Sequence, residues 1–182
     1  MRKIFCILLV VTLAALSCTT DQNQQPSTSL DKRPNILLIV TDDMGYTDIG
    51  AFGSEIRTPN IDFLARSGVA MTNFYAAPTC SPARAMLLTG MDNHFTGFGT
   101  MAEHLATNQR GQPGYEGYLS RDTVTVATLL RDAGYHTYMA GKWHIGAVQG
   151  MWPHERGFEH SFALMQGGSS HFSDKKRMLS IY

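Results

Sequence analysis

This chain of 182 residues has few cysteines, no excess of either charge and no apolar run long enough to cross a bilayer. Basic and acidic residues balance at 15 each, which argues against a nucleic-acid partner. The apolar stretch 4–16 is shorter than the about 20 residues of a membrane-spanning helix. No internal repeat is visible, and the roughly 150 residues after the N-terminal region suffice for one ordinary domain with a core.

The N-terminus has the pattern of an export signal. Arg2 and Lys3 precede the apolar stretch 4–16, and small residues follow it, which predicts a signal peptide over residues 1–17 that is removed after export. A buried helix and a retained anchor are the alternatives. Cys18 also resembles the lipid-acceptor cysteine of bacterial lipoproteins, although Ala15 stands where leucine is usual. The expected location is therefore the periplasm or, with a lipid anchor at Cys18, the outer membrane.

Residues 18–32 are polar and are expected to form a flexible tether between membrane and domain. The domain itself then covers residues 33–182, and Cys80 is its single cysteine, since Cys6 lies in the signal. A lone cysteine in an exported domain is a buried inert side chain, a reactive thiol or a modified residue. Before its neighbours are considered, the buried inert side chain is favoured, because free cysteine is among the most buried residue types.

Short apolar runs alternate with helical patterns along the domain. The runs 35–40, 69–75 and 135–140 are predicted strands, the first of them covered on both faces. Such alternation predicts an α/β fold, a mainly parallel sheet flanked by helices.

Three helices are expected between and after these strands. The first begins at Thr58 and Pro59 and stops at Gly68, and the second runs from the Ser81-Pro82 pair to Leu88. The third begins at Thr123 and ends at Gly134. The side chains expected to face inward are Ile61, Leu64 and Ala65 in the first helix and Val126, Leu129, Leu130 and Ala133 in the third.

Three polar clusters follow predicted strands. Asp42 and Asp43 follow the first, Cys80 precedes the helix after the second, and Lys142 and His144 follow the last. Each has a structural explanation: adjacent aspartates form turns or caps, a lysine is commonly a solvated charge, and a histidine is commonly a hydrogen-bonded structural residue. Ligand sites in parallel sheets lie beyond the carboxyl ends of the strands, so convergence of all three clusters there predicts a site.

The side chains of these clusters suit the binding of an oxyanion. Adjacent carboxylates repel unless a cation neutralises them, and such hard oxygen ligands favour calcium or magnesium over zinc. Cys80 lies where a helix N-terminus favours negative charge, and Arg84 lies one turn further along. Lys142 adds a point charge, and His144 is a candidate proton carrier.

Four ordered segments resemble the sulfatase family. CSPAR at 80–84, continued by LTG at 88–90, resembles the family's maturation signature, with Ala83 where many members have serine. NILLIVTDD at 35–43, TPNID at 58–62 and GKWHIG at 141–146 are similar to family segments in the same order. The resemblance extends from residue 33 to the end and is strongest to the bacterial arylsulfatase branch of the alkaline phosphatase superfamily. It implies an alkaline phosphatase-like fold that this chain contains in part.

The resemblance implies that Cys80 is oxidised to Cα-formylglycine by a formylglycine-generating or anaerobic sulfatase-maturating enzyme. One hydroxyl of the hydrated aldehyde would attack the sulfur of a sulfate monoester, and loss of the second hydroxyl's proton would expel sulfate. Family likeness further implies that Asp42, Asp43 and residue 80 bind Ca²⁺. Arg84 would stabilise the hydrate, Lys142 would contact sulfate, and His144 would assist breakdown of the covalent intermediate.

The family places further metal ligands and catalytic residues beyond position 182. We therefore expect the N-terminal part of a longer arylsulfatase, which alone binds calcium poorly and lacks activity. His171 is either near the substrate entrance or structural. Two other functions stay open: a phosphomonoester or phosphonate hydrolase of the same superfamily, and a catalytically dead exported lipoprotein that binds a ligand or partner.

Overall fold

The computed structural model describes residues 33–169 and 179–182. The expected signal peptide (1–17), the tether (18–32) with Cys18, and His171 lie outside the described residues. The chain divides into two compact units, residues 1–41 and 42–182, so residues 33–41 are considered by themselves. Among the described residues, no helix is long and apolar enough to cross a membrane.

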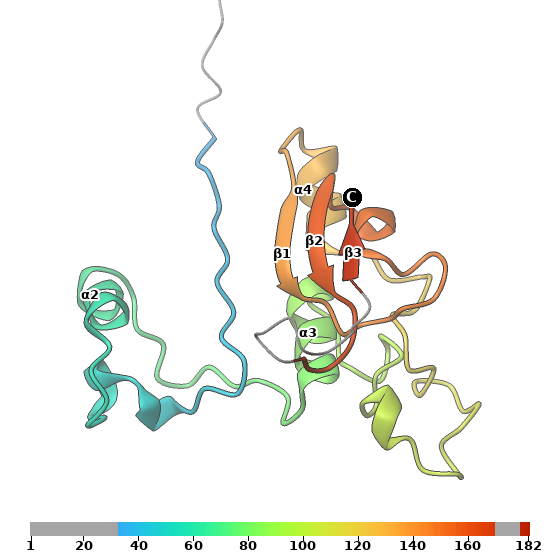
Figure 1. Ribbon diagram of the computed structural model, residues 1–182, viewed down its shortest axis with the longest axis horizontal. Helices are drawn as coiled ribbons and strands as arrows, with labels where there is room; N and C mark the ends of the chain where they lie inside the picture. The colour runs from blue at the N-terminus through green and yellow to red at the C-terminus, as the bar shows by residue number, and fades with distance from the viewer. Residues whose placement is uncertain (1–32, 170–178) are drawn as a thin grey trace, which may run out of the picture. The chain divides into compact units, whose positions relative to one another are not determined.

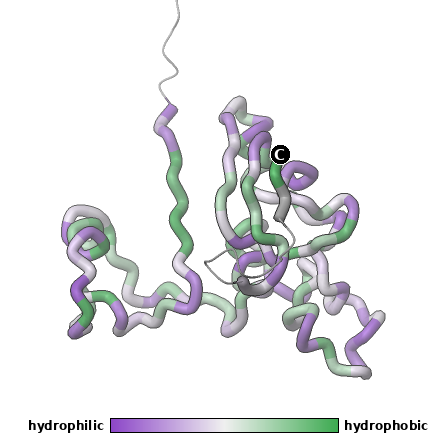
Figure 2. The backbone as a smooth tube through the Cα atoms, in the orientation of Figure 1, coloured by the Kyte–Doolittle hydropathy of each residue, from purple (hydrophilic) through white to green (hydrophobic). Residues whose placement is uncertain are grey.

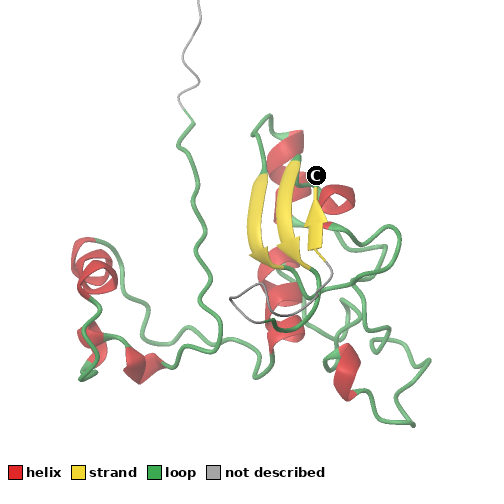
Figure 3. Ribbon diagram, in the orientation of Figure 1, coloured by secondary structure: helices red, strands yellow, loops and turns green. Residues whose placement is uncertain are grey.

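The second unit contains a three-stranded mixed sheet (Figures 1 and 3). Its order is β1 (Tyr138–Lys142), β2 (His160–Leu164) and β3 (Leu179–Ile181). β1 and β2 are parallel, with Lys142 opposite Leu164, whereas β3 runs antiparallel to β2. The α/β class is confirmed, but the described sheet contains one parallel pair and one antiparallel pair, so it is not mainly parallel.

Two of the predicted strands do not form. Residues 35–40 are extended but carry no strand hydrogen bonding, and Leu37 is 84% exposed, although Figure 2 shows this run as a continuous hydrophobic stretch. Residues 69–75 form no strand either. A strand requires a hydrogen-bonded neighbour, and neither segment pairs with another in the part of the chain that the structure describes. The third strand begins at Tyr138, later than predicted, because the Tyr135 amide still donates to the Leu130 carbonyl at the end of the preceding helix.

The three predicted helices are confirmed as α2 (Pro59–Ser67), α3 (Cys80–Thr89) and α4 (Val126–Asp132). α2 starts at the proline after Thr58 and stops at Gly68, as predicted. Gly90 ends α3 in the left-handed conformation, with φ 70°, where its amide donates to the Met86 carbonyl. Four short 3₁₀ turns complete the described helices: η1 (Tyr46–Asp48), η2 (Gly50–Phe52), η3 (Ala102–His104) and η4 (Pro153–Arg156).

Helix starts and inner faces differ in detail from the prediction. Thr79, not Ser81, is the N-cap of α3, so Cys80 is itself the first helical residue. α4 starts after Thr125, whose hydroxyl accepts from the Thr128 amide. The inner-face predictions for Leu64, Val126, Leu129 and Ala133 are wrong, since these side chains are exposed, Leu64 and Leu129 to 60% and 59%. Helical periodicity identifies an apolar face, but which element covers it depends on tertiary packing.

The core joins α3 to the carboxyl ends of β1 and β2. Ala85 of α3 packs with Trp143 and Ile145, which directly follow β1, and with Ala163 and Met165 at the end of β2. The indole Nε1–H of Trp143 is satisfied by the Met151 carbonyl at 2.8 Å. This packing places the start of α3 and the end of β1 beside each other.

Candidate active site

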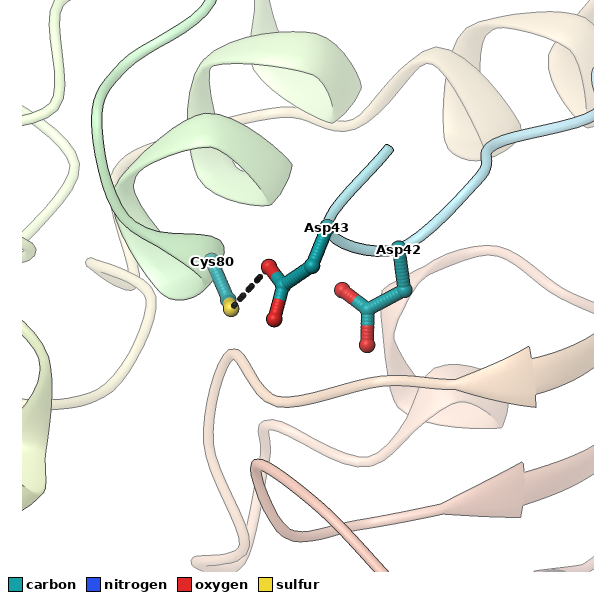
Figure 4. A group of neighbouring side chains, drawn as sticks. All are labelled: Asp42, Asp43 and Cys80. Atoms are coloured by element: carbon teal, nitrogen blue, oxygen red, sulfur yellow. Dashed lines mark hydrogen bonds between the residues drawn. The ribbon is translucent and has the colours of Figure 1, made fainter. Parts of the chain in front are cut away.

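Asp42, Asp43 and Cys80 form one cluster in which a ligand atom from each lies within 4.8 Å of the others (Figure 4). Cys80 opens α3, and its Sγ lies 3.9 Å from Oδ1 of Asp43. The first helical residue sits among backbone amides that have no partner within the helix, where negative charge is favoured. Residues 37 positions apart in the sequence thus meet at one helix terminus.

Two cations converge on Asp42. Lys142 Nζ lies 3.0 Å from Oδ2, and Arg84 Nη2 lies 3.1 Å from Oδ1. Both cationic side chains are mostly buried, at 10% and 14% exposure, whereas Asp42 is half-exposed at 47%. Partial burial by itself would raise the pKa of Asp42, but hydrogen bonds and charge from Lys142 and Arg84 outweigh it and hold that pKa below its ordinary value.

Arg84 also connects α3 to β1. Its Nη1 donates to the Lys142 backbone carbonyl at 2.8 Å, which fixes the guanidinium against the end of the strand. Its Nε is buried and has no hydrogen-bond partner among the described residues. With the amides at the start of α3 and the ammonium of Lys142, the guanidinium forms a group of hydrogen-bond donors suited to oxyanions.

His144 is held by a different set of contacts. It is 7% exposed, and its Nε2 lies 3.0 Å from Oε1 of Glu103 in η3. Its Nδ1 is buried and has no hydrogen-bond partner in the part of the chain that the structure describes. Burial lowers the pKa of His144, and the charges of Lys142 and Arg84 lower it further, against the opposing effect of Glu103.

Backbone strain is concentrated in this region. Within residues 33–169 and 179–182, the non-glycine residues with positive φ are Asp43, at 55°, and His144, at 57°. Such conformations are uncommon outside glycine and persist only where surrounding contacts impose them. Both residues belong to the predicted site, which is where retained strain is most often found.

The donor set fits a hard divalent cation in part. Calcium takes six to eight oxygen ligands, and Asp42 and Asp43 supply carboxylate oxygens. The thiol of Cys80 is a soft ligand that suits calcium poorly, so an oxygen at this position would improve the match. Asp42 and Asp43 are therefore the described residues that would hold Ca²⁺, and they need further ligands to complete its coordination.

The structure brings together five of the predicted side chains. Asp42, Asp43 and Cys80 form one cluster, and Arg84 and Lys142 join it through ion pairs with Asp42. The hydrogen bond of His144 goes instead to Glu103. Sequence reasoning missed Glu103, because it lies 41 residues before its partner and belongs to no motif.

Comparison with known proteins identifies relatives of residues 34–179, which match the sequence profile of the Sulfatase family. An uncharacterized sulfatase of Schizosaccharomyces pombe is 51% identical over 145 residues, 78% of this chain and 26% of that protein. An arylsulfatase of Klebsiella aerogenes is 50% identical over 143 residues, 79% of this chain and 30% of that protein. The crystal structure of Ps i-CgsB in complex with k-i-k-neocarrahexaose matches with a TM-score of 0.67 at 36% identity, covering 79% of this chain and 31% of the other. The chain thus spans 26% to 31% of the length of these three proteins.

Proposed function

Because this chain belongs to the sulfatase family, we propose that the protein of which it forms part is an arylsulfatase, a sulfuric ester hydrolase that cleaves sulfate monoesters. We assign it formylglycine at position 80, Ca²⁺ held by Asp42, Asp43 and residue 80, and an alkaline phosphatase-like fold. Export to the periplasm or outer membrane, with Cys18 as the alternative lipid anchor, is part of the same proposal. A formylglycine-generating or anaerobic sulfatase-maturating enzyme would be its partner in maturation.

The observation that carries this proposal is the position of Cys80. It opens α3, lies against Asp43, and is one helical turn before Arg84, whose guanidinium contacts the end of β1. A hydrated aldehyde at this position would supply one hydroxyl to attack sulfur, with departure of the alcohol or phenol, and a second hydroxyl whose deprotonation would expel sulfate and restore the carbonyl. An unmodified thiol has no equivalent second group.

Lys142 and Arg84 are the residues that would bind the sulfate group. Both are cationic, mostly buried and directed at the same carboxylate, so they are held in place before substrate arrives. Sulfate oxygens would compete with Asp42 for these donors, and a divalent cation at Asp42 would relieve that competition. The arrangement favours a dianionic or monoanionic ester group over a neutral one.

His144 would act as the proton carrier near the reacting group. Burial keeps its pKa below the ordinary value, so it is neutral and able to accept a proton at neutral pH. Asp43 would hold residue 80 in place, as the 3.9 Å contact to its sulfur indicates.

The decisive experiment is mass spectrometry of the peptide containing residue 80, taken from full-length protein co-expressed with a formylglycine-generating enzyme. We expect loss of the thiol and gain of an aldehyde, together with hydrolysis of an aryl sulfate that a calcium chelator suppresses. Cys80→Ser, with thermal melting as the check on folding, should abolish turnover. Normal sulfate ester hydrolysis by protein that retains the thiol would refute the mechanism.

The same preparation distinguishes the other two functions. Faster cleavage of an aryl phosphate than of an aryl sulfate would indicate a phosphomonoester hydrolase. An unmodified thiol with no hydrolysis of either ester and no calcium dependence would indicate a binding protein.

A further inference from the structure

The two ring nitrogens of His144 have different surroundings. Nε2 is paired with Glu103, whereas Nδ1 is enclosed and has no hydrogen-bond partner among residues 33–169 and 179–182. We propose that Glu103 is a positioning residue that holds His144 in the tautomer protonated at Nε2, so that Nδ1 is the nitrogen that exchanges a proton during ester cleavage. The role of His144 in this inference rests on the proposed function. The hydrogen bond between Glu103 and His144 can be tested separately.

The tautomer follows from the chemistry of the partner. A carboxylate only accepts hydrogen bonds, so the 3.0 Å contact requires a proton on Nε2. In a neutral imidazole the other nitrogen is then an acceptor. A second proton on Nδ1 would be an unsatisfied donor, since that atom is buried and no described residue accepts from it.

The charges around the ring support a single proton on it. Glu103 favours the protonated ring, whereas Lys142 and Arg84 disfavour it, as burial does. Partial burial would raise the pKa of Glu103, but hydrogen bonds from its own backbone and from His144, with a smaller contribution from neighbouring His104, hold that pKa below its ordinary value. Glu103 is therefore ionised and His144 neutral at neutral pH.

The backbone of a third segment also limits movement of the His144 ring. A Cβ built at Gly167, which follows β2, would lie 2.6 Å from both Cε1 and Nε2 of His144. The ring thus lies directly against the backbone of this glycine and is hydrogen-bonded to η3. With Nε2 occupied and the ring enclosed, Nδ1 is the nitrogen left for a reacting group.

The test uses full-length protein labelled with ¹⁵N-histidine, with His144→Gln to assign the resonances. We expect the wild type to show protonated Nε2 and unprotonated Nδ1 at His144. Glu103→Ala should lose this preference and lower kcat about ten- to hundredfold with KM unchanged, as loss of a residue that orients a functional histidine commonly does. Glu103→Gln retains an acceptor oxygen and should keep the tautomer and recover part of kcat. Glu55→Ala, which removes an exposed carboxylate elsewhere, is the matched control.

A proton on Nδ1 in the wild type would overturn the proposal, as would wild-type kcat in Glu103→Ala. Equal losses of kcat in the Ala and Gln variants with an unchanged tautomer would also overturn it, because they would show a merely structural effect. If Glu103→Ala does not fold, the wild-type spectrum and the tautomer and kcat of Glu103→Gln still test the proposal. If the wild-type protein cleaves no sulfate ester, the proposed function is wrong. The spectrum would still test the hydrogen bond between Glu103 and His144.

Discussion

Replacing Gly167 with alanine should displace the His144 imidazole and slow ester hydrolysis. The added Cβ would lie 2.6 Å from two ring atoms, whereas ordinary contacts begin at 3.4 Å. The ring must therefore move by about 1 Å, because overlap of this size is strongly repulsive. That movement would also strain the 3.0 Å hydrogen bond to Glu103.

The size of the effect follows from this displacement. A misplacement of about 1 Å in a catalytic group can cost about 10²-fold in rate. Overpacking of a buried site typically destabilises the fold by about 1–3 kcal/mol as well. Because His144 is buried and bonded, its ring cannot simply rotate out into solvent.

Gly168→Ala provides a matched control at the next position. A Cβ there meets no described residue within 4 Å, and neither glycine has the positive φ that would strain an alanine. Both substitutions thus change chain flexibility equally, and only the first touches the histidine. The assay is steady-state hydrolysis of an aryl sulfate by full-length protein, with thermal melting of each variant. Equal kcat values for the two variants would refute the reasoning.

Three further predictions concern the cations, the acid stability and a helix cap. Arg84→Ala should lower kcat by about 10²- to 10³-fold, because it removes a preorganised hydrogen-bond donor. Steady-state kinetics on an aryl sulfate would measure this loss. Activity equal to wild type would contradict the role assigned to Arg84. The pKa of Asp42 is depressed on folding, so its contribution to stability is present above the ordinary value of 3.8 and is lost as pH falls through the lower folded value. Urea unfolding at decreasing pH should show this loss in the wild type and not in Asp42→Asn, and parallel curves would contradict it. Thr125→Ala should lower the free energy of unfolding by about 1–2 kcal/mol, because the hydroxyl caps α4 and donates to the Arg156 carbonyl. Thr125→Ser keeps the hydroxyl and should restore most of the urea midpoint. Equal decreases of the midpoint in the two variants would contradict the role of the hydroxyl as a cap.

Local signals determined the helices and the list of candidate site residues. Thr58 and Pro59 before an apolar pattern, and Gly68 and Gly90 after one, marked helix boundaries because capping depends on a few neighbouring residues. The CSPAR segment and three other segments in the family's order indicated the family for the same reason, since each is a short local pattern. Such features can be recognised without knowledge of the rest of the fold.

Pairing between distant segments was decided by the tertiary structure alone. The run 35–40 had the composition of a strand, but strand formation depends on a neighbour that composition does not specify. Leu129 fitted a helical apolar face, yet it is exposed, because what covers a face is set by other elements. Likewise, no local pattern joins Glu103 to His144 or Gly167 to the imidazole ring, since these contacts exist only once separate segments pack. The sequence by itself thus determined which residue types could do chemistry, while packing decided which nitrogen of His144 contacts Glu103.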